Sequence, residues 1–200
     1  MRTCYFSSHP TAENRDLIRD VVQTYFDDIV DITSKESLPD VQPNSILISD
    51  RTTFFFSEDY LNQFDSAFNV HPSLLPSHKG SFPILWACLA GDAHGVSIHE
   101  MNPEVDAGQI VWQKEVPYDD TETFSQVFYR SRQYIIHALH QTCSRIIADT
   151  VFDLSTNQQP DPFHHKKKDG ELLLSRMPLR WHTPIREARS LTKDLLSDLF

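Results

Sequence analysis

The feature that most constrains the fold is a short apolar segment at residues 66–70, which runs directly into a loop rich in proline, histidine and serine. Such a segment predicts a strand, and the alternation of its side chains places Asn69 and His71 on the same face at its carboxyl end. Open α/β sheets bind their ligands outside the carboxyl ends of their strands. The segment therefore predicts an α/β fold with a functional site near these two residues.

Apolar patterning predicts the elements that precede this segment. Strands are expected at residues 3–6, 29–32 and 45–48. Between the first two, apolar side chains at helical spacing over residues 17–26 indicate a helix, which Thr11 is expected to cap. Strand, helix and strand in this order favour a parallel sheet with right-handed crossovers.

The elements that follow the loop are predicted in the same way. They are a helix from Pro83 to near Gly91, paired strands at residues 96–99 and 109–112, and a long helix over residues 121–149 with Thr121 or Glu122 near its start. The expected fold class is therefore α/β, with a twisted, mainly parallel, Rossmann-like sheet flanked by helices and a short C-terminal extension.

Asn69, His71 and Asp106 offer three chemical groups to one reaction centre. An amide and a histidinium can each donate a hydrogen bond to a developing oxyanion, and a carboxylate beside the imidazole can hold it protonated and accept a proton from a nucleophile. Asp106 alone, two residues before a glycine, is also typical of a hairpin turn. Together the three groups indicate direct acyl transfer, in which an amine attacks a carbonyl and no Ser or Cys nucleophile is needed.

The chain resembles the 10-formyltetrahydrofolate-dependent formyltransferases. The blocks that carry the resemblance are residues 69–76, 79–80, 94–99 and 105–110, in the order of the family. The resemblance implies that Asn69, His71 and Asp106 form the catalytic triad, with His99 in a supporting role near the formyl group. It also implies that 10-formyltetrahydrofolate is the co-substrate and that a primary amine accepts the formyl group.

Binding candidates come from other loops. In the family the loop after the third strand lines the pterin pocket, so the aromatic run at residues 54–56 is a candidate, although such runs also occur in packed cores. The cofactor-binding candidates are Phe54, Phe55, Phe56, His99, Val105 and Gly108. The substrate-binding candidates are Ser8, His9, Lys79, Lys166 and Lys167. A lysine cluster can hold an anionic substrate, and a solvated surface is the alternative for the last two.

Features outside the catalytic blocks make the chain most like the nucleotide-sugar N-formyltransferases. These features are Trp86, the histidine and lysine cluster at residues 164–169 and the segment at residues 183–192. The expected acceptor is the amino group of a nucleotide-linked amino deoxysugar, which is a small anionic molecule. A glycinamide ribonucleotide-type transformylase, a formyltetrahydrofolate hydrolase and a non-catalytic folate-binding relative remain open.

We expect two regions along the chain. Residues 1–150 form the formyltransferase catalytic domain, with an N-terminal half shorter than is usual in the family, and residues 151–200 form a C-terminal extension. A homodimer is one arrangement that such a chain could adopt.

Charge and composition narrow the class of partner and the compartment. A net charge of -10 disfavours nucleic acid as a partner, methionyl-tRNA included, because that binding relies on Lys and Arg at phosphates. Cys4, Cys88 and Cys143 form no CxxC pair and are expected to be free buried thiols. The histidines lack metal-ligand spacing, so we expect no metal. Because no signal peptide or membrane-spanning stretch is recognisable, we expect a cytoplasmic protein.

Overall fold

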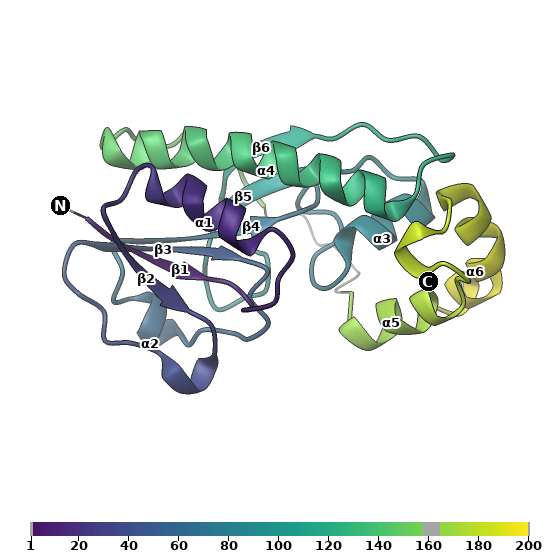
Figure 1. The fold of residues 1–200 in the computed structure, drawn as a ribbon, viewed down its shortest axis with the longest axis horizontal. Helices are drawn as coiled ribbons and strands as arrows, with labels where there is room; N and C mark the ends of the chain where they lie inside the picture. The colour runs from purple at the N-terminus through teal and green to yellow at the C-terminus, as the bar shows by residue number, and fades with distance from the viewer. Residues whose placement is uncertain (1, 158–164, 200) are drawn as a thin grey trace.

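The computed structural model describes residues 2–157 and 165–199, and these form an α/β fold around a six-stranded sheet of order β2-β1-β3-β4-β5-β6 (Figure 1). The strands are β1 Thr3–Ser7, β2 Asp28–Ile32, β3 Ser45–Asp50, β4 Ser66–His71, β5 Gly95–Glu100 and β6 Ile110–Glu115. The first four strands pair in parallel, whereas β5 runs antiparallel to β4 and β6 antiparallel to β5. The prediction of a mainly parallel sheet flanked by helices is confirmed.

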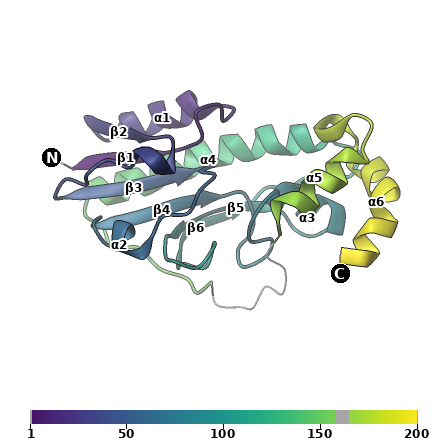
Figure 2. The same cartoon turned by 90° about the horizontal axis from the view of Figure 1, so that it is seen from below.

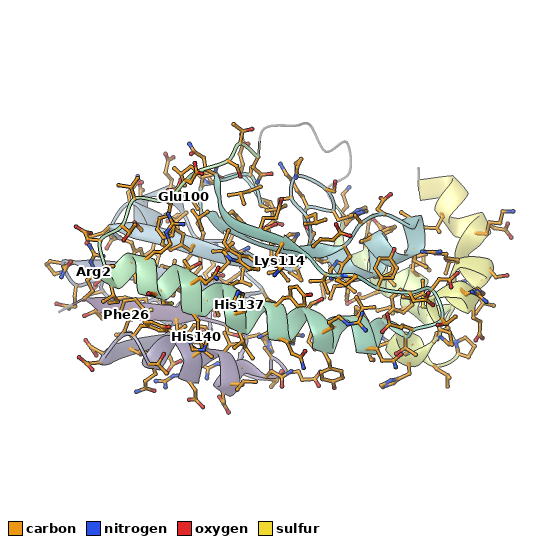
Figure 3. All side chains as sticks on the ribbon, turned by 90° about the horizontal axis from the view of Figure 1, so that it is seen from above. Arg2, Phe26, Glu100, Lys114, His137 and His140 are labelled. Carbon is orange, nitrogen blue, oxygen red and sulfur yellow. The ribbon has the colours of Figure 1, made fainter. Side chains whose placement is uncertain are left out.

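Helices cover both faces of the sheet. The α-helices are α1 Arg15–Gln23, α2 Glu58–Leu61, α3 Pro83–Ala90, α4 Phe124–Ile147, α5 Lys167–Ser175 and α6 Ile185–Leu199, and the 3-10 helices are η1 Lys35–Ser37 and η2 Arg180–His182. Figures 1 and 3 show α1 and α4 side by side along one face, while α2 lies on the other. Arg2 fastens the far end of α4 to the sheet, since its guanidinium donates to the carbonyl of Ile146 at 2.6 Å.

Alternation along the strands sorts side chains between these layers. Phe68 and Val70 of β4, together with Val96 and Ile98 of β5, pack in the core under α1 and α4. A second core on the opposite face contains Tyr5, Ile32, Leu47, Phe56, Tyr60, Leu61 and Phe64. Because successive side chains of a strand point to opposite faces, the residues between the apolar ones in β4 and β5 face away from α4. The sheet therefore directs a row of polar side chains toward the face opposite α4.

The C-terminal helices lie at one end of the molecule against α3 and the start of α4 (Figure 2). A third hydrophobic cluster joins Leu85 of α3 and Phe124 of α4 to Leu173 of α5 and Ile185 of α6. This cluster contains residues from both sides of the expected boundary at residue 150, and the division into a catalytic domain and an extension stays a prediction.

Two helices begin a few residues later than predicted, and each difference has a local cause. α1 begins at Arg15 after Asn14, and Thr11 instead contacts the ring of His9, with 3.0 Å between Oγ1 and Nδ1. Thr11 therefore makes a contact within the turn and does not cap the helix. α4 begins at Phe124 after a capping box made by Thr123 and its partner at the third helical position.

The remaining predicted elements are confirmed, including the helix that Pro83 starts and Gly91 ends. All three cysteines are free and buried, as expected. Burial raises the pKa of the Cys88 and Cys143 thiols to about 12. Within residues 2–157 and 165–199, every helix is too short or too polar to cross a membrane.

Candidate active site

Cross-strand pairing builds the candidate site at the boundary between the parallel and antiparallel parts of the sheet. Asn69 of β4 lies directly opposite His99 of β5, and His71 lies opposite Ser97. These side chains share the face that points away from α4. Asp106 comes from the loop that connects β5 to β6. The fold thereby brings Asn69 and Asp106, which are 37 positions apart in the sequence, within hydrogen-bonding distance.

Four groups converge on the carboxylate of Asp106. Its Oδ2 accepts a hydrogen bond from the backbone N–H of Gly80 at 2.8 Å and lies 3.4 Å from Nδ1 of His71. Its Oδ1 accepts from Nδ2 of Asn69 at 3.3 Å and lies 3.5 Å from Nε2 of His99. The carboxylate side chain is only 10% exposed. The structure thus brings the three predicted catalytic residues together, with His99 as a fourth member of the cluster.

The surroundings of Asp106 favour its ionised form. Burial raises the pKa of this carboxyl, but the imidazole of His71, the hydrogen bond and charge of His99 and the N–H of Gly80 outweigh that effect. The net result is a pKa well below the usual value of 3.8. The carboxylate is therefore charged at neutral pH and is a weak base.

Backbone carbonyls determine how the two imidazoles are oriented. Nε2 of His71 donates to the carbonyl of His78 at 3.0 Å, so Nδ1 is the nitrogen that faces Asp106. Nδ1 of His99 donates to the carbonyl of Glu100 at 2.7 Å, which turns Nε2 toward the same carboxylate. His71 has an acceptor at each nitrogen, and this arrangement suits an imidazolium with two N–H donors.

Polar residues of β5 and β6 hold the proline-rich loop that follows His71. The hydroxyl of Ser97 donates to the carbonyl of Ser73 at 2.7 Å and accepts from the N–H of Leu75 at 3.2 Å. The amide of Gln113 donates to the carbonyl of Leu75 at 2.8 Å. The loop is therefore fixed by side chains that the sheet itself positions.

His165, which follows α4 in the sequence, contacts the loop that carries Gly80. His165 pairs through its backbone with the 79–81 loop, accepting from the N–H of Ser81 at 2.8 Å and donating to the carbonyl of Lys79 at 3.0 Å. Gly80 has a φ of 90° there, and a Cβ on it would lie 2.5 Å from the carbonyl oxygen of His165. Only glycine allows this approach, which leaves the Gly80 N–H directed at Asp106.

Sequence reasoning missed several groups of this cluster. The N–H of Gly80 and the carbonyl of His78 are backbone groups that every residue type carries, so no residue identity announces them. The ring of His165 stacks on Trp86 at 4.2 Å and lies 3.1 Å from the ring of His78, counted from Nε2 to Nδ1. The adjacent histidines of the C-terminal segment were the available signal for this contact.

The cofactor-binding candidates lie in varied environments. Phe55 is 71% exposed, Phe54 is half-buried and Phe56 is buried in the core, stacked on Tyr60 with 5.6 Å between ring centres. Phe56 is therefore part of the aromatic packing of this core. Val105 and Gly108 flank Asp106 in its loop, and His99 contacts the carboxylate. Their roles in cofactor binding stay predictions.

The substrate-binding candidates also occupy different places. Ser8 is fully buried, and its hydroxyl has no hydrogen-bond partner in the described part of the chain. His9 is half-buried in the turn after β1. Lys79 is buried with its ammonium 3.5 Å from the carbonyl of Asn157. Lys166 and Lys167 are exposed at the start of α5. Their roles in substrate binding stay predictions, and the described residues include no metal-ligand group of three or more His, Cys, Asp or Glu side chains.

Comparison with known sequences identifies a family. The sequence profile described as "Formyl transferase" matches residues 40–142. Methionyl-tRNA formyltransferase of Streptococcus thermophilus is 44% identical over 75 residues, which are 37% of this chain and 24% of that protein. The aligned part therefore spans about a quarter of the curated relative.

Comparison with solved structures finds the same architecture over nearly the whole chain. The formyltransferase PseJ from Anoxybacillus kamchatkensis superposes with a TM-score of 0.77 and 26% identity, covering 92% of this chain and 97% of that one. A sugar N-formyltransferase from a Shewanella species gives a TM-score of 0.71 at 18% identity, covering 98% of this chain and 88% of that one. At that lower identity the second likeness describes the fold alone.

Proposed function

The chain belongs to the formyl transferase family, and we propose that it transfers a formyl group from 10-formyltetrahydrofolate to the amino group of a nucleotide-linked amino deoxysugar. The observation that carries the proposal is the convergence of Asn69, His71 and His99 on the carboxylate of Asp106. Such a cluster can stabilise an oxyanion and move protons without a covalent intermediate on the protein.

The proposed reaction exchanges one carbon–nitrogen bond for another. The lone pair of the acceptor amine attacks the formyl carbon, and the carbonyl electron pair moves onto oxygen to give a tetrahedral oxyanion. When that pair returns, the bond from carbon to N10 of the folate breaks. The amine nitrogen loses one proton and N10 gains one, so formamide and tetrahydrofolate leave with atoms and charges balanced.

Asn69 supports this chemistry as a donor to the oxyanion. Its Nδ2 carries two hydrogens, of which one is directed at Oδ1 of Asp106 at 3.3 Å, and Nε2 of His99 lies 3.2 Å from the same nitrogen. A formyl oxygen can accept the second hydrogen while the bond to Asp106 persists. The carboxylate then keeps the amide oriented during the reaction, which is the preorganisation that stabilises a transition state.

His71 and Asp106 are suited to stabilise the negative charge that develops in the same step. In the proposed step His71 acts as an imidazolium 3.4 Å from the carboxylate, and its positive charge stabilises the developing oxyanion beside it. The low pKa of Asp106 makes it a poor acceptor for a proton from an ammonium group. Its orienting and electrostatic role is therefore better supported than its role as a base.

The acceptor class is supported by the likeness to PseJ, whose structure is in complex with UDP-4,6-dideoxy-4-formamido-L-AltNAc and tetrahydrofolate. We propose the same class of acceptor, a nucleotide-linked amino deoxysugar, for this chain because the two chains align over nearly their full lengths. The proposal includes a binding contribution from Ser8, His9, Lys79, Lys166 and Lys167 to an anionic acceptor, and from Phe54, Phe55, Phe56, Val105 and Gly108 to the folate.

An acceptor screen tests the proposal. The purified chain is incubated with 10-formyltetrahydrofolate and one amine at a time, and tetrahydrofolate formation is followed together with the mass of the formylated product. UDP-linked and dTDP-linked amino deoxysugars are expected to react, and the Asp106→Asn variant is the inactive control. Reaction with glycinamide ribonucleotide alone would replace the proposed acceptor, and formate release without any amine would indicate a hydrolase.

A further inference from the structure

The backbone at Asp106 is strained and needs support. Its φ is 49°, in the left-handed region that residues other than glycine rarely adopt. Such a conformation persists only where surrounding contacts hold it, and it is common at functional sites. The position of the Asp106 carboxylate therefore depends on whatever fixes the peptide groups of its loop.

Asn157 makes those contacts. Its Nδ2 donates one hydrogen bond to the carbonyl of Asp106 at 2.7 Å and another to the carbonyl of Gly108 at 3.0 Å. The side chain is only 2% exposed, so water does not compete for these two carbonyls. One amide group thus spans the strained turn from one end to the other.

The amide of Asn157 acts through its donor side alone. Its Oδ1 is buried and has no hydrogen-bond partner in the described part of the chain. The reverse orientation would place that oxygen against two carbonyl oxygens, which repel it, so the hydrogen bonds determine the assignment. A side chain of the same shape without N–H donors would therefore lose the contact.

The loop cannot move away on its other side. A Cβ on Gly108 would lie 1.8 Å from the carbonyl oxygen of Glu100, so this part of the loop presses against the end of β5. Asn157 is itself anchored nearby, because Ser155 and Ile110 exchange two backbone hydrogen bonds of 3.0 Å. The turn is thus held between β5 and the segment that follows α4.

Asn157 also reaches the second loop that binds Asp106. Its carbonyl lies 3.5 Å from Nζ of the buried Lys79, and the next residue, Gly80, donates to Oδ2 of Asp106. The backbone of Asp106 and the N–H that binds its side chain are therefore both linked to Asn157.

We propose that Asn157 is a positioning residue that holds the strained 106–108 turn and thereby keeps the Asp106 carboxylate against His71 and Gly80. The proposal rests on the proposed function for its kinetic consequence. Without the amide, the turn relaxes toward an ordinary backbone conformation and the carboxylate moves away from the imidazole. A displacement of about 1 Å at a reacting group can reduce a rate by about a hundredfold.

Two substitutions separate hydrogen bonding from packing. Asn157→Asp keeps the shape but replaces the donor with an acceptor, and Asn157→Ala removes both. Thr156→Ala, at an exposed neighbour, is the matched control. We expect both Asn157 variants to lower kcat about ten- to a hundredfold with less than about a threefold change in KM for 10-formyltetrahydrofolate, whereas the control stays within about twofold of the parent chain.

A second readout does not depend on turnover. The amide signal of Gly80 in a nitrogen-15 NMR spectrum reports its hydrogen bond to Asp106. We expect this signal to move in both Asn157 variants in the direction seen for Asp106→Asn, and to stay in place in Thr156→Ala. If Asn157→Asp does not fold, the kcat and the Gly80 amide signal of Asn157→Ala test the proposal.

The outcomes distinguish the two proposals. Parent-like kcat and an unmoved Gly80 signal in folded Asn157→Ala would overturn the positioning role. If Asn157→Asp keeps a parent-like kcat and an unmoved Gly80 signal, the side chain of Asn157 acts through packing, and the positioning role by hydrogen bonding is overturned. If the parent chain transfers no formyl group to any amine, the proposed function fails, while movement of the Gly80 signal still supports the positioning of Asp106.

Discussion

Two buried carboxylates of this protein have opposite surroundings. Asp50, at the end of β3, is 1% exposed and receives two hydrogen bonds of 2.7 Å from the guanidinium of Arg132 on α4. Asp106 is similarly enclosed, but no Lys or Arg of residues 2–157 and 165–199 makes an ion pair with it. Its neighbours are two imidazoles, an amide and a backbone N–H.

The difference indicates that the carboxylate of Asp50 stabilises the fold, whereas that of Asp106 is suited to a reaction. A guanidinium stays protonated at every physiological pH, so the pair of Asp50 and Arg132 cannot take part in proton transfer. Asp106 has no such permanent countercharge among the described residues, and its imidazole neighbours belong to a side-chain type that can donate and accept protons during a reaction. Neutralising Asp106 should therefore affect turnover, and neutralising Asp50 should affect folding.

Asp106→Asn is expected to have the largest effect. We expect kcat to fall by at least about a hundredfold, because the variant loses the charge that orients and stabilises the imidazolium of His71. The fold should be retained, since the amide fills the same space. Steady-state kinetics with circular dichroism measure both, and Asp153→Asn at an exposed position is the control. Near-normal turnover would show that Asp106 is dispensable.

Asp50→Asn is expected to reverse this pattern. Removing one member of a buried ion pair leaves an uncompensated charge and costs about 3–5 kcal/mol of unfolding free energy. Urea titration measures the loss, and specific activity per folded molecule should stay within a fewfold of the parent chain. A stable Asp50→Asn variant with lost activity would place this residue in the chemistry instead.

His99→Gln is expected to have an intermediate effect. The variant loses the imidazole that contacts both Asn69 and Asp106, and we expect about a tenfold lower kcat. His137→Gln, at an exposed position on α4 labelled in Figure 3, is the matched control and should leave kcat unchanged. Equal rates for the two variants would argue against any supporting role of His99.

The smallest expected effect concerns acid stability. Because folding lowers the pKa of Asp106, its ionised form stabilises the folded state fully above the unfolded value of about 3.9, and this contribution is lost as pH falls through the folded pKa. The parent chain should therefore lose its advantage over Asp106→Asn below pH of about 4, by at most about 1.4 kcal/mol per pH unit. Urea titrations of both proteins at several pH values measure this, and a difference that does not change with pH would contradict it.

Local alternation made the centre of the site predictable. Phe68 and Val70 face the core, so Asn69 and His71 had to share the opposite face, and the structure places them there. For Asp106 the local pattern gave weaker support, because an Asp near a glycine is also typical of a turn, and the resemblance to a family supplied the rest. The placement of these residues is confirmed, whereas their catalytic roles stay predictions.

Contacts between distant segments were beyond sequence reasoning. Asn157 belongs to a polar stretch that is typical of a connector, and its contact with Asp106 spans 51 positions. Arg132 did leave a signal, since it occupies a position on the apolar stripe of α4 between buried Phe124 and Ile135. A charged residue on such a stripe requires a buried partner, but the sequence does not say which carboxylate supplies it.

Residues that follow α4 contact the two loops of the site, and these residues are synthesised last among the parts of that site. Every strand of the sheet, and the loops that carry Gly80 and Asp106, leave the ribosome before Asn157 and His165 do. A nascent chain that has just completed α4 thus contains the family's sequence signature but lacks the contacts that hold those two loops. Assembly of the reaction centre is therefore a late event in the making of this protein.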